Sequence, residues 1–415
     1  MRTLLRALAG VVLLAVFHTP ACADAVGDVH DLALKTSRAA GTPPGAQLDT
    51  LVIVDLAMFD AANAIERRYR PYRTHAAAAP AADGDAAAAA VAAGCAALVR
   101  WHPEQAAAAT RACEDLLGAL PKTASTADSI AMGADAGRAI VDARKAELRV
   151  VANAYRPKAA PGVYVATPLP IGFEVATMTP YVLSSPAQFR PGGPPTLASA
   201  TWVRDFNEVK AMGARASAAR SPAQTATAVY WSSAGPQQFL DSLPGVAIGM
   251  AKTPAEHARV LAVMTMAMAD ASIAVFDAKN AYDFWRPITA IRNGDLDGND
   301  ATAADATWAP LLETPLHQEY PCAHCAALAG LVAAVTVLGG ETDLREPVVI
   351  RPAAGAGNVP LRSWAHVADV LSEVQDARVW GGMHYRSSTA AGVALGTAAG
   401  RWVAQTQLQP LAARP

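Results

Sequence analysis

The sequence predicts an all-α protein that folds as a large helical bundle. Apolar, Ala-rich stretches of helical length recur along the 415 residues and are separated by Pro or Gly, which is the pattern of helices joined by turns. No alternation of apolar and polar residues is long enough to predict a β-strand, and no internal repeat is found. One long region is rich in proline instead, so we expect helices on both sides of an extended loop.

Residues 1–23 have the pattern of a secretory signal peptide. Two arginines precede an apolar run that ends in the small-residue sequence Ala21-Cys22-Ala23. A lipoprotein anchor at Cys22 is less favoured, because Thr19 and Pro20 stand where such signals have an aliphatic residue. We therefore exclude residues 1–23 from the fold and expect a periplasmic or secreted protein.

The composition argues against nucleic-acid and membrane partners. The formal net charge is −2 and the Lys and Arg residues are scattered, so the chain has no basic stripe. Beyond the signal pattern, the best apolar run, Cys325 to Gly340, is shorter than the ~20 residues that cross a bilayer. We expect a soluble protein that acts on small molecules; a homo-oligomer is compatible with the sequence.

The N-terminal part, residues 24–150, has a helical pattern. Helices are expected at 48–70, 86–100, 104–120 and 126–149. Cys95 and Cys113 lie on neighbouring helical segments and either form a disulfide or fill the core. The predicted export permits the first alternative, because disulfides persist in oxidising compartments.

Residues 151–200 form the predicted Pro-rich loop region. Nine prolines in this stretch exclude long helices. A loop of this length inside a compact chain is usually functional, such as a wall over a site, or else a linker.

Residues 201–415 are expected to form the C-terminal helical bundle that carries the site. Its clearest helices are expected at 253–286, 322–340, 363–380 and 387–407. Gly392, Gly396 and Gly400 recur every fourth residue, which gives the last helix a smooth face. Another helix can therefore approach that face closely.

Lys279 and Arg286 are the first candidates for binding an anion. They lie seven residues apart on a continuous helical pattern that Pro287 ends, so both should project from one helix face. Asp283 lies between them, which leaves the alternative of an ordinary ladder of surface ion pairs.

The segment Pro321-Cys322-Ala323-His324 opens the helix expected at 322–340. Backbone N–H groups in the first turn of a helix have no partner within it and favour an oxyanion. His324 can give or take a proton at the edge of such an anion, although a histidine that merely caps the helix is the commoner case.

Arg378 and His384 form the third motif, on either side of a Gly-Gly turn. The planar fork of arginine matches phosphate-like oxyanions. An arginine at a helix C-terminus is also an ordinary partner of the helix dipole. It is the combination of the three motifs that indicates an anion site.

In this order, the motifs resemble the signature of the acid phosphatase and vanadium haloperoxidase superfamily, which includes the type 2 phosphatidic acid phosphatases. That signature is Lys, six residues and Arg-Pro; then Pro-Ser-Gly-His; then Ser-Arg, five residues and His. The matching positions are Lys279, Arg286, Pro287, Pro321, His324, Arg378 and His384. Softer similarity to the secreted haloperoxidase branch extends to residues 58–72 and 184–195. The chain departs from the signature at Cys322-Ala323, where the family has Ser-Gly, and at Ala377, where it has Ser.

The resemblance implies a helical-bundle site for a tetrahedral oxyanion, with vanadate as cofactor or phosphate as ligand. Lys279, Arg286 and Arg378 would neutralise its equatorial oxygens. The backbone N–H of Ala323 would assist them. Cys322 stands where the family uses a serine hydroxyl, and a thiol is the weaker donor.

The resemblance also implies roles for the histidines. His384 would be the vanadium ligand of a haloperoxidase or the nucleophile of a phosphatase, and His324 would act as acid or base opposite it. Lys279 would polarise bound peroxide in the haloperoxidase. His317 resembles a histidine of the bromoperoxidase pattern, with a plain loop histidine as the alternative.

Cys322 and Cys325 form a CxxC pair, which also occurs in metal and redox sites. A zinc site usually has about four ligands, and one CxxC pair supplies two. A thioredoxin-like centre lies in a βαβ unit, which this sequence does not show. We predict instead that the two cysteines form a disulfide in the mature protein, which their spacing at a helix start permits.

The leading hypothesis is a vanadium-dependent haloperoxidase-like enzyme. It would oxidise halide, with bromide favoured by His317, using hydrogen peroxide, and pass the halogen to an organic acceptor. A soluble acid phosphatase that hydrolyses phosphomonoesters through a phosphohistidine is the second hypothesis. The third is a non-catalytic oxyanion-binding protein in which Cys322 has disabled turnover.

Overall fold

The computed structural model describes residues 21–73, 83–148, 151–233, 237–339, 343–350 and 362–412. Helices dominate these residues, which confirms the predicted all-α class. Their only strands are β1 (Asp343–Ile350) and β2 (Arg362–His366), which form one antiparallel pair. Most of the predicted signal peptide lies outside the described residues.

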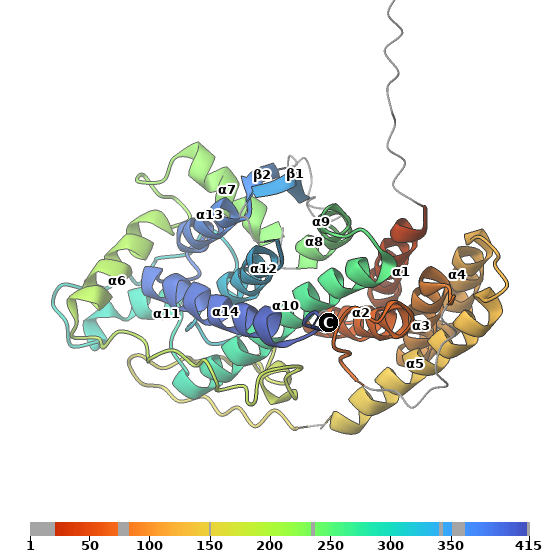
Figure 1. Cartoon of the computed structure of the whole chain (residues 1–415). Coiled ribbons are helices and arrows are strands. Elements are labelled where there is room, and N and C mark those ends of the chain that lie inside the picture. Colours follow the sequence, from red (N-terminus) through yellow and green to blue (C-terminus); the bar gives the residue numbers. More distant parts are fainter. Residues whose placement is uncertain are drawn as a thin grey trace, which may run out of the picture.

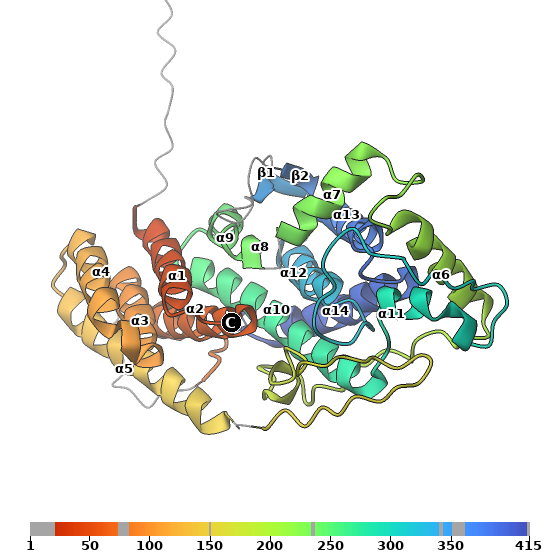
Figure 2. The ribbon, with the colours of Figure 1, turned by 180° about the vertical axis from the view of Figure 1, so that it is seen from behind.

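Five helices gather at one end of the molecule (Figures 1 and 2). They are α1 (Ala21–Ala39), α2 (Pro44–Glu66), α3 (Ala86–Trp101), α4 (Ala106–Ala119) and α5 (Thr126–Glu147), with the 3-10 turn η1 (Pro103–Gln105) before α4. All but α1 were expected from the sequence. The side chain of Asp85 accepts a hydrogen bond from the backbone N–H of Ala88 at 3.0 Å, and this cap starts α3 where its alanine pattern begins.

A disulfide joins α3 to α4 in this group. It links Cys95 and Cys113, whose Cα atoms lie 5.8 Å apart. Of the two alternatives that the sequence left open for these cysteines, pairing is therefore the one observed.

The remaining helices form the larger part of the bundle. They are α6 (Ala200–Met212), α7 (Pro222–Ser233), α8 (Gln237–Leu240), α9 (Leu243–Met250), α10 (Pro254–Tyr282), α11 (Pro287–Arg292), α12 (Ala323–Gly339), α13 (Val367–Trp380) and α14 (Arg386–Thr406), with the 3-10 turn η3 (Gly294–Leu296). The helix expected at 363–380 begins only at Val367, because the residues before it pair with β1 as strand β2. This backbone pairing overrides the local helical pattern.

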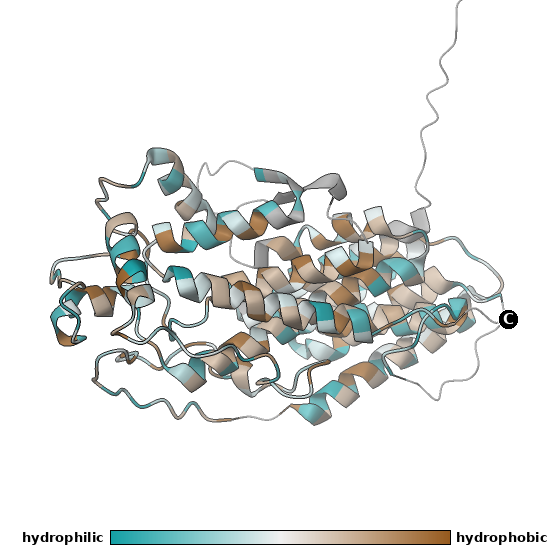
Figure 3. Cartoon of the chain, turned by 60° about the vertical axis from the view of Figure 1, so that its left-hand side comes forward, coloured by the Kyte–Doolittle hydropathy of each residue, from teal (hydrophilic) through white to brown (hydrophobic). Residues whose placement is uncertain are grey.

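Helices α10, α12 and α14 run through the middle of this larger part (Figures 1 and 2). Apolar residues are frequent in the helices of the interior (Figure 3). Of the described helices, α10 alone is long and apolar enough to cross a membrane, but 83% of its most apolar window is buried inside the protein. The core helix of a bundle has the same composition.

The glycines of α14 bring this helix into close contact with α12. A Cβ atom added at Gly392 would lie 2.4 Å from the carbonyl oxygen of Cys322, and one added at Gly396 would lie 2.0 Å from that of Ala326. At Gly400 the distance to the carbonyl oxygen of Gly330 would be 2.2 Å. The predicted close approach at this face is therefore confirmed, and it fixes the position of the first turn of α12.

The Pro-rich loop is anchored to the core by a buried carboxylate. Between residues 151 and 199 the only helical segment is the 3-10 turn η2 (Val175–Thr177), and Val163 forms an isolated β-bridge with Phe284. Asp270, inside α10, accepts hydrogen bonds from three consecutive backbone N–H groups of residues 181–183 at 2.7–2.9 Å. The polar groups of both segments are thereby satisfied in the interior.

The same loop lies over the two segments that flank the predicted site residues. The N–H of Tyr164 donates to the carbonyl of Asp283 at 2.7 Å, and the N–H of Ile171 donates to the carbonyl of Leu316 at 2.8 Å. Of the two roles considered for the loop, these contacts favour a wall over the site and disfavour a free linker.

We expect Gly396→Ala to lower the free energy of unfolding by about 2 kcal/mol or more, because overpacking a tight contact typically costs about 1–3 kcal/mol. Gly118→Ala in α4 is the matched control, since a Cβ there would meet no atom within 4 Å. The control should be neutral or stabilising by up to about 1 kcal/mol. Urea denaturation of both variants measures the difference, and equal stabilities would contradict the close helix contact.

Replacing Cys95 and Cys113 together by serine is expected to lower the free energy of unfolding by about 3 kcal/mol, the usual effect of opening a loop of this length. Guanidinium denaturation of the double variant tests this. Wild-type protein in reductant provides the control and should show a similar loss. A wild-type curve that reductant leaves unchanged would speak against the disulfide.

Candidate oxyanion-binding site

Lys279 and Arg286 are brought together, but not as two residues on one helix face. Helix α10 ends at Tyr282, and Asp283 adopts a left-handed conformation with φ 48°. Arg286 is extended and precedes α11, which begins at Pro287. The predicted continuous helix through Arg286 is therefore wrong, because the chain leaves the helix one turn earlier.

Both side chains instead bind the loop immediately before α12. The Nζ of Lys279 donates to the carbonyl oxygens of Gln318 at 2.8 Å and Glu319 at 2.9 Å. The Nε of Arg286 donates to the carbonyl oxygen of His317 at 2.9 Å. Three consecutive carbonyl groups thus fix the two cations in one place.

Arg378 joins them from the last turn of α13. Its Nη2 lies 3.1 Å from the Sδ of Met383, and the carbonyl oxygen of Met383 accepts from Nη1 of Arg286 at 2.8 Å. The Nε of Arg378 is buried and has no hydrogen-bond partner. A buried N–H without an acceptor costs free energy, and an oxyanion would supply the acceptor.

Positive charge is concentrated in this cluster. Lys279, Arg286 and Arg378 are 0%, 1% and 2% exposed. Burial lowers the pKa of all three, that of Arg286 to about 10, and that of Lys279 falls well below its usual value with help from the charge of Arg286. Glu319 is the fully buried carboxylate placed against them, and burial raises its pKa to about 7. A bound anion would relieve this excess of buried positive charge.

His384 is held in one tautomer beside the cations. Its Nδ1 lies 2.7 Å from Oε1 of Glu319, and its Nε2 lies 3.2 Å from Nη1 of Arg286. Because a guanidinium only donates, Nε2 accepts and Nδ1 carries the ring proton. Burial and the charges of Arg286 and Lys279 lower the pKa of His384 well below its ordinary value. A neutral ring therefore presents an Nε2 lone pair to the cluster.

Glu319 is the member of the site that sequence reasoning missed. It lies in the loop sequence HQEYP, far from His384 in the chain, and no spacing relates the two. The general need of a functional histidine for an acceptor at its second nitrogen was the signal that could have found it.

The start of α12 supplies backbone donors. Helix α12 begins at Ala323, as expected. The first amides, those of Ala323 and His324, have no partner within the helix. Both residues are half-buried, whereas the cations are fully buried, so they form the more accessible side of the cluster. Burial and the charges of Arg378 and Lys279 lower the pKa of His324 well below its ordinary value.

The predicted disulfide between Cys322 and Cys325 is absent, and both cysteines are free, buried thiols. The Sγ of Cys322 accepts a hydrogen bond from the backbone N–H of Cys325 at 3.3 Å. This sulfur therefore caps the helix as a serine oxygen would, and does not bond to the second sulfur.

His317 contacts the cluster through Arg286. Its Nδ1 lies 3.0 Å from Nη2 of that arginine, and its ring packs edge-on against Phe276 with centroids 5.3 Å apart. The contacts of its Nδ1 and carbonyl oxygen thus hold Arg286 in position.

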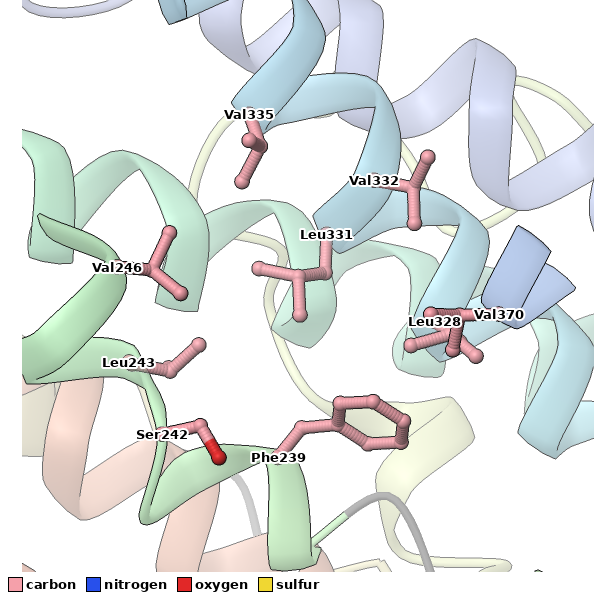
Figure 4. A pocket seen from close by; sticks show the side chains of 9 residues that line it. All are labelled: Phe239, Ser242, Leu243, Val246, Leu328, Leu331, Val332, Val335 and Val370. Carbon is pink, nitrogen blue, oxygen red and sulfur yellow. The ribbon is translucent and has the colours of Figure 1, made fainter. Parts of the chain in front are cut away.

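Two further pockets lie away from these residues. A cavity of about 20 Å³ between α9, α12 and α13 is lined by apolar side chains and Ser242 (Figure 4), and has room for about one water. A second, of about 520 Å³, lies beside Cys95 and Cys113.

In the described parts of the chain, no group of three or more His, Cys, Asp or Glu could hold a metal ion. The donor set at the cluster fits an oxyanion better than a bare cation.

Residues 259–412, which include every residue of the cluster, match the family model of the VCPO second helical-bundle domain. Solved structures resemble most of the chain. A bacterial vanadium-dependent iodoperoxidase has a TM-score of 0.72 and 20% identity, covering 94% of this chain and 98% of its own. The apo form of a bacterial vanadium-dependent chloroperoxidase has a TM-score of 0.66 and 16% identity, covering 87% and 92%. The holo form of a bacterial vanadium-dependent chloroperoxidase has a TM-score of 0.65 and 16% identity, covering 94% of this chain and 94% of its own.

Sequence comparison with curated proteins gives no match. The likeness to the solved structures therefore shows the fold of the chain. The family model matches only the C-terminal segment. The chain has the fold of the vanadium haloperoxidases, and its residues 259–412 match the family model of the VCPO second helical-bundle domain.

Proposed function

We propose that this protein is a vanadium-dependent haloperoxidase that oxidises bromide with hydrogen peroxide and passes the halogen to a small organic acceptor. The observation that carries the proposal is the set of three buried cations with an unpartnered Arg378 Nε, gathered beside a neutral His384. The fold shared with haloperoxidases supports it. An export route, consistent with the signal pattern, is part of the proposal.

The residues present fit vanadate. Lys279, Arg286 and Arg378 would bind its oxygens, and the free amide of Ala323 would add a neutral donor. The Nε2 lone pair of His384 would bind vanadium. When bound, vanadate supplies a Lewis acid that activates hydrogen peroxide toward halide.

The remaining polar side chains have supporting tasks. His324 is neutral and half-buried, so it would accept a proton from incoming hydrogen peroxide. Glu319 keeps the proton of His384 on Nδ1, which leaves Nε2 unprotonated, so its lone pair could bind vanadium in place of the hydrogen bond from Arg286. His317 holds Arg286 in place, and through this cation it would influence how halide approaches.

A soluble acid phosphatase is the second candidate. The observation that favours it is the same Glu319–His384 pair, because a histidine with a fixed tautomer and an unprotonated Nε2 is also suited to attack phosphorus. His324 would then protonate the leaving alcohol. A protein that binds oxyanions without turnover is the third candidate.

We expect vanadate-reconstituted protein, purified without phosphate, to brominate monochlorodimedone in the presence of hydrogen peroxide. Turnover should disappear without vanadate and fall at least 100-fold in His384→Ala, which removes the vanadium ligand. Chloride and iodide assayed in parallel give the halide preference.

Absence of turnover in folded protein that still binds vanadate would count against the haloperoxidase. Hydrolysis of p-nitrophenyl phosphate by the same sample would then favour the phosphatase. Absence of activity in both assays would favour the protein that binds oxyanions without turnover.

Glu319→Ala is expected to lower the turnover rate about 10–100-fold, because removing the acceptor at the second nitrogen of a ligating histidine typically has this effect. Glu319→Gln keeps an acceptor for Nδ1 of His384 and should recover part of the loss. Activity and vanadate affinity are measured together, with circular dichroism as the folding control. If Gln is no better than Ala, the hydrogen bond to His384 is not what Glu319 contributes.

A further inference from the structure

Cys322 and Cys325 are free thiols at the start of α12, against the cations of the oxyanion site. We propose that hydrogen peroxide oxidises Cys322 and that Cys325 resolves the product, so that the pair acts as a peroxide switch on anion binding that an external dithiol reductant resets. The inference rests on the proposed function only in that peroxide must enter the site. It concerns a conditional state of the two thiols, not a permanent disulfide, which the structure does not contain.

The geometry keeps the two sulfurs close without joining them. The Sγ of Cys322 accepts a hydrogen bond from the backbone N–H of Cys325 at 3.3 Å, which places the two cysteines side by side at the first turn of α12. A disulfide needs Cβ atoms about 3.5–4.5 Å apart, and the two sulfurs are not bonded here, so closing it requires the first turn of α12 to shift.

The two thiols differ in their surroundings. Burial acts to raise the pKa of Cys322, but its hydrogen bond with Cys325 and the charge of Arg378 lower the pKa overall. Burial and the hydrogen bond with Cys322 raise the pKa of Cys325 well above its usual value. The pair therefore combines one thiolate-forming attacker with one protonated partner, as selective thiol oxidation requires.

The chemistry balances with hydrogen peroxide as the only oxidant. The thiolate of Cys322 attacks one peroxide oxygen, the O–O bond breaks, and a sulfenic acid forms while hydroxide leaves and is protonated to water. The sulfur of Cys325 then attacks that of Cys322, the S–O bond breaks, and a second water leaves with the proton of the Cys325 thiol. Two thiols and one peroxide thus give one disulfide and two waters.

Closing the disulfide would disturb the oxyanion site, because the first turn of α12 cannot move toward α14. A Cβ at Gly392 would already lie 2.4 Å from the carbonyl oxygen of Cys322 and 3.1 Å from the Cβ of Cys325. Helix α14 therefore blocks displacement on its side. The shift falls on Ala323 and His324, which lie between the two cysteines and carry the free amides.

The test treats vanadate-free protein, without halide, with one equivalent of hydrogen peroxide. Intact mass and peptide mapping should show the loss of two hydrogens at Cys322 and Cys325, separate from the Cys95–Cys113 disulfide, and dithiothreitol should restore them. Calorimetry with inorganic phosphate should show at least ten-fold weaker binding in the oxidised protein and recovery after reduction.

Two variants locate the chemistry. Cys322→Ser should resist peroxide and keep its own phosphate affinity after treatment. Cys325→Ser should stop at a sulfenic acid on Cys322 that dimedone traps. Thiols that survive peroxide, or oxidation that leaves phosphate affinity unchanged, would overturn the inference. Neither result depends on halogenation, so failure of the proposed function is distinguishable.

Discussion

The burial of three cations in one small volume is the constraint on which the rest of the site depends. Lys279, Arg286 and Arg378 are almost fully buried, and each needs acceptors that water no longer provides. Backbone carbonyls on both sides of the site supply most of them, which dictates how the loop before α12 and the turn after α13 must run. The Nε of Arg378 is left without a partner, and a bound anion would supply the missing acceptor.

Packing of α14 against α12 positions the remaining parts of the site, which are the amides at the start of α12 and His384. The glycine face of α14 lets α12 approach so closely that the carbonyl of Cys322 lies against Gly392. Helix α14 also begins two residues after His384, at Arg386, so its contact with α12 helps to position both the amides of α12 and the histidine. The precision that oxyanion chemistry needs therefore comes from backbone contacts in the core, which tolerate little adjustment.

The sequence allowed the fold class, most helices and the identities of the clustered residues to be predicted. The route from Lys279 to Arg286 was predicted wrongly, because nothing before Pro287 breaks the helical pattern and the left-handed turn at Asp283 has no clear sequence signal. Strand β2 and the contact of Glu319 with His384 also escaped prediction. Both depend on partners distant in sequence, which local periodicity does not report.

Cys322, which stands where the resembling signature has serine, allows the positive charge of the site to stabilise either a bound anion or a thiolate. A serine hydroxyl stays neutral, so the cations serve only the bound anion. A thiol beside Arg378 and Lys279 can become an anion itself, and it then competes for the same positive charge. An oxyanion in the site would screen these cations, raise the pKa of Cys322 and favour its protonated, unreactive form. In the proposed switch, occupancy of the site and the redox state of its thiols would therefore also be linked by electrostatics, before any movement of α12.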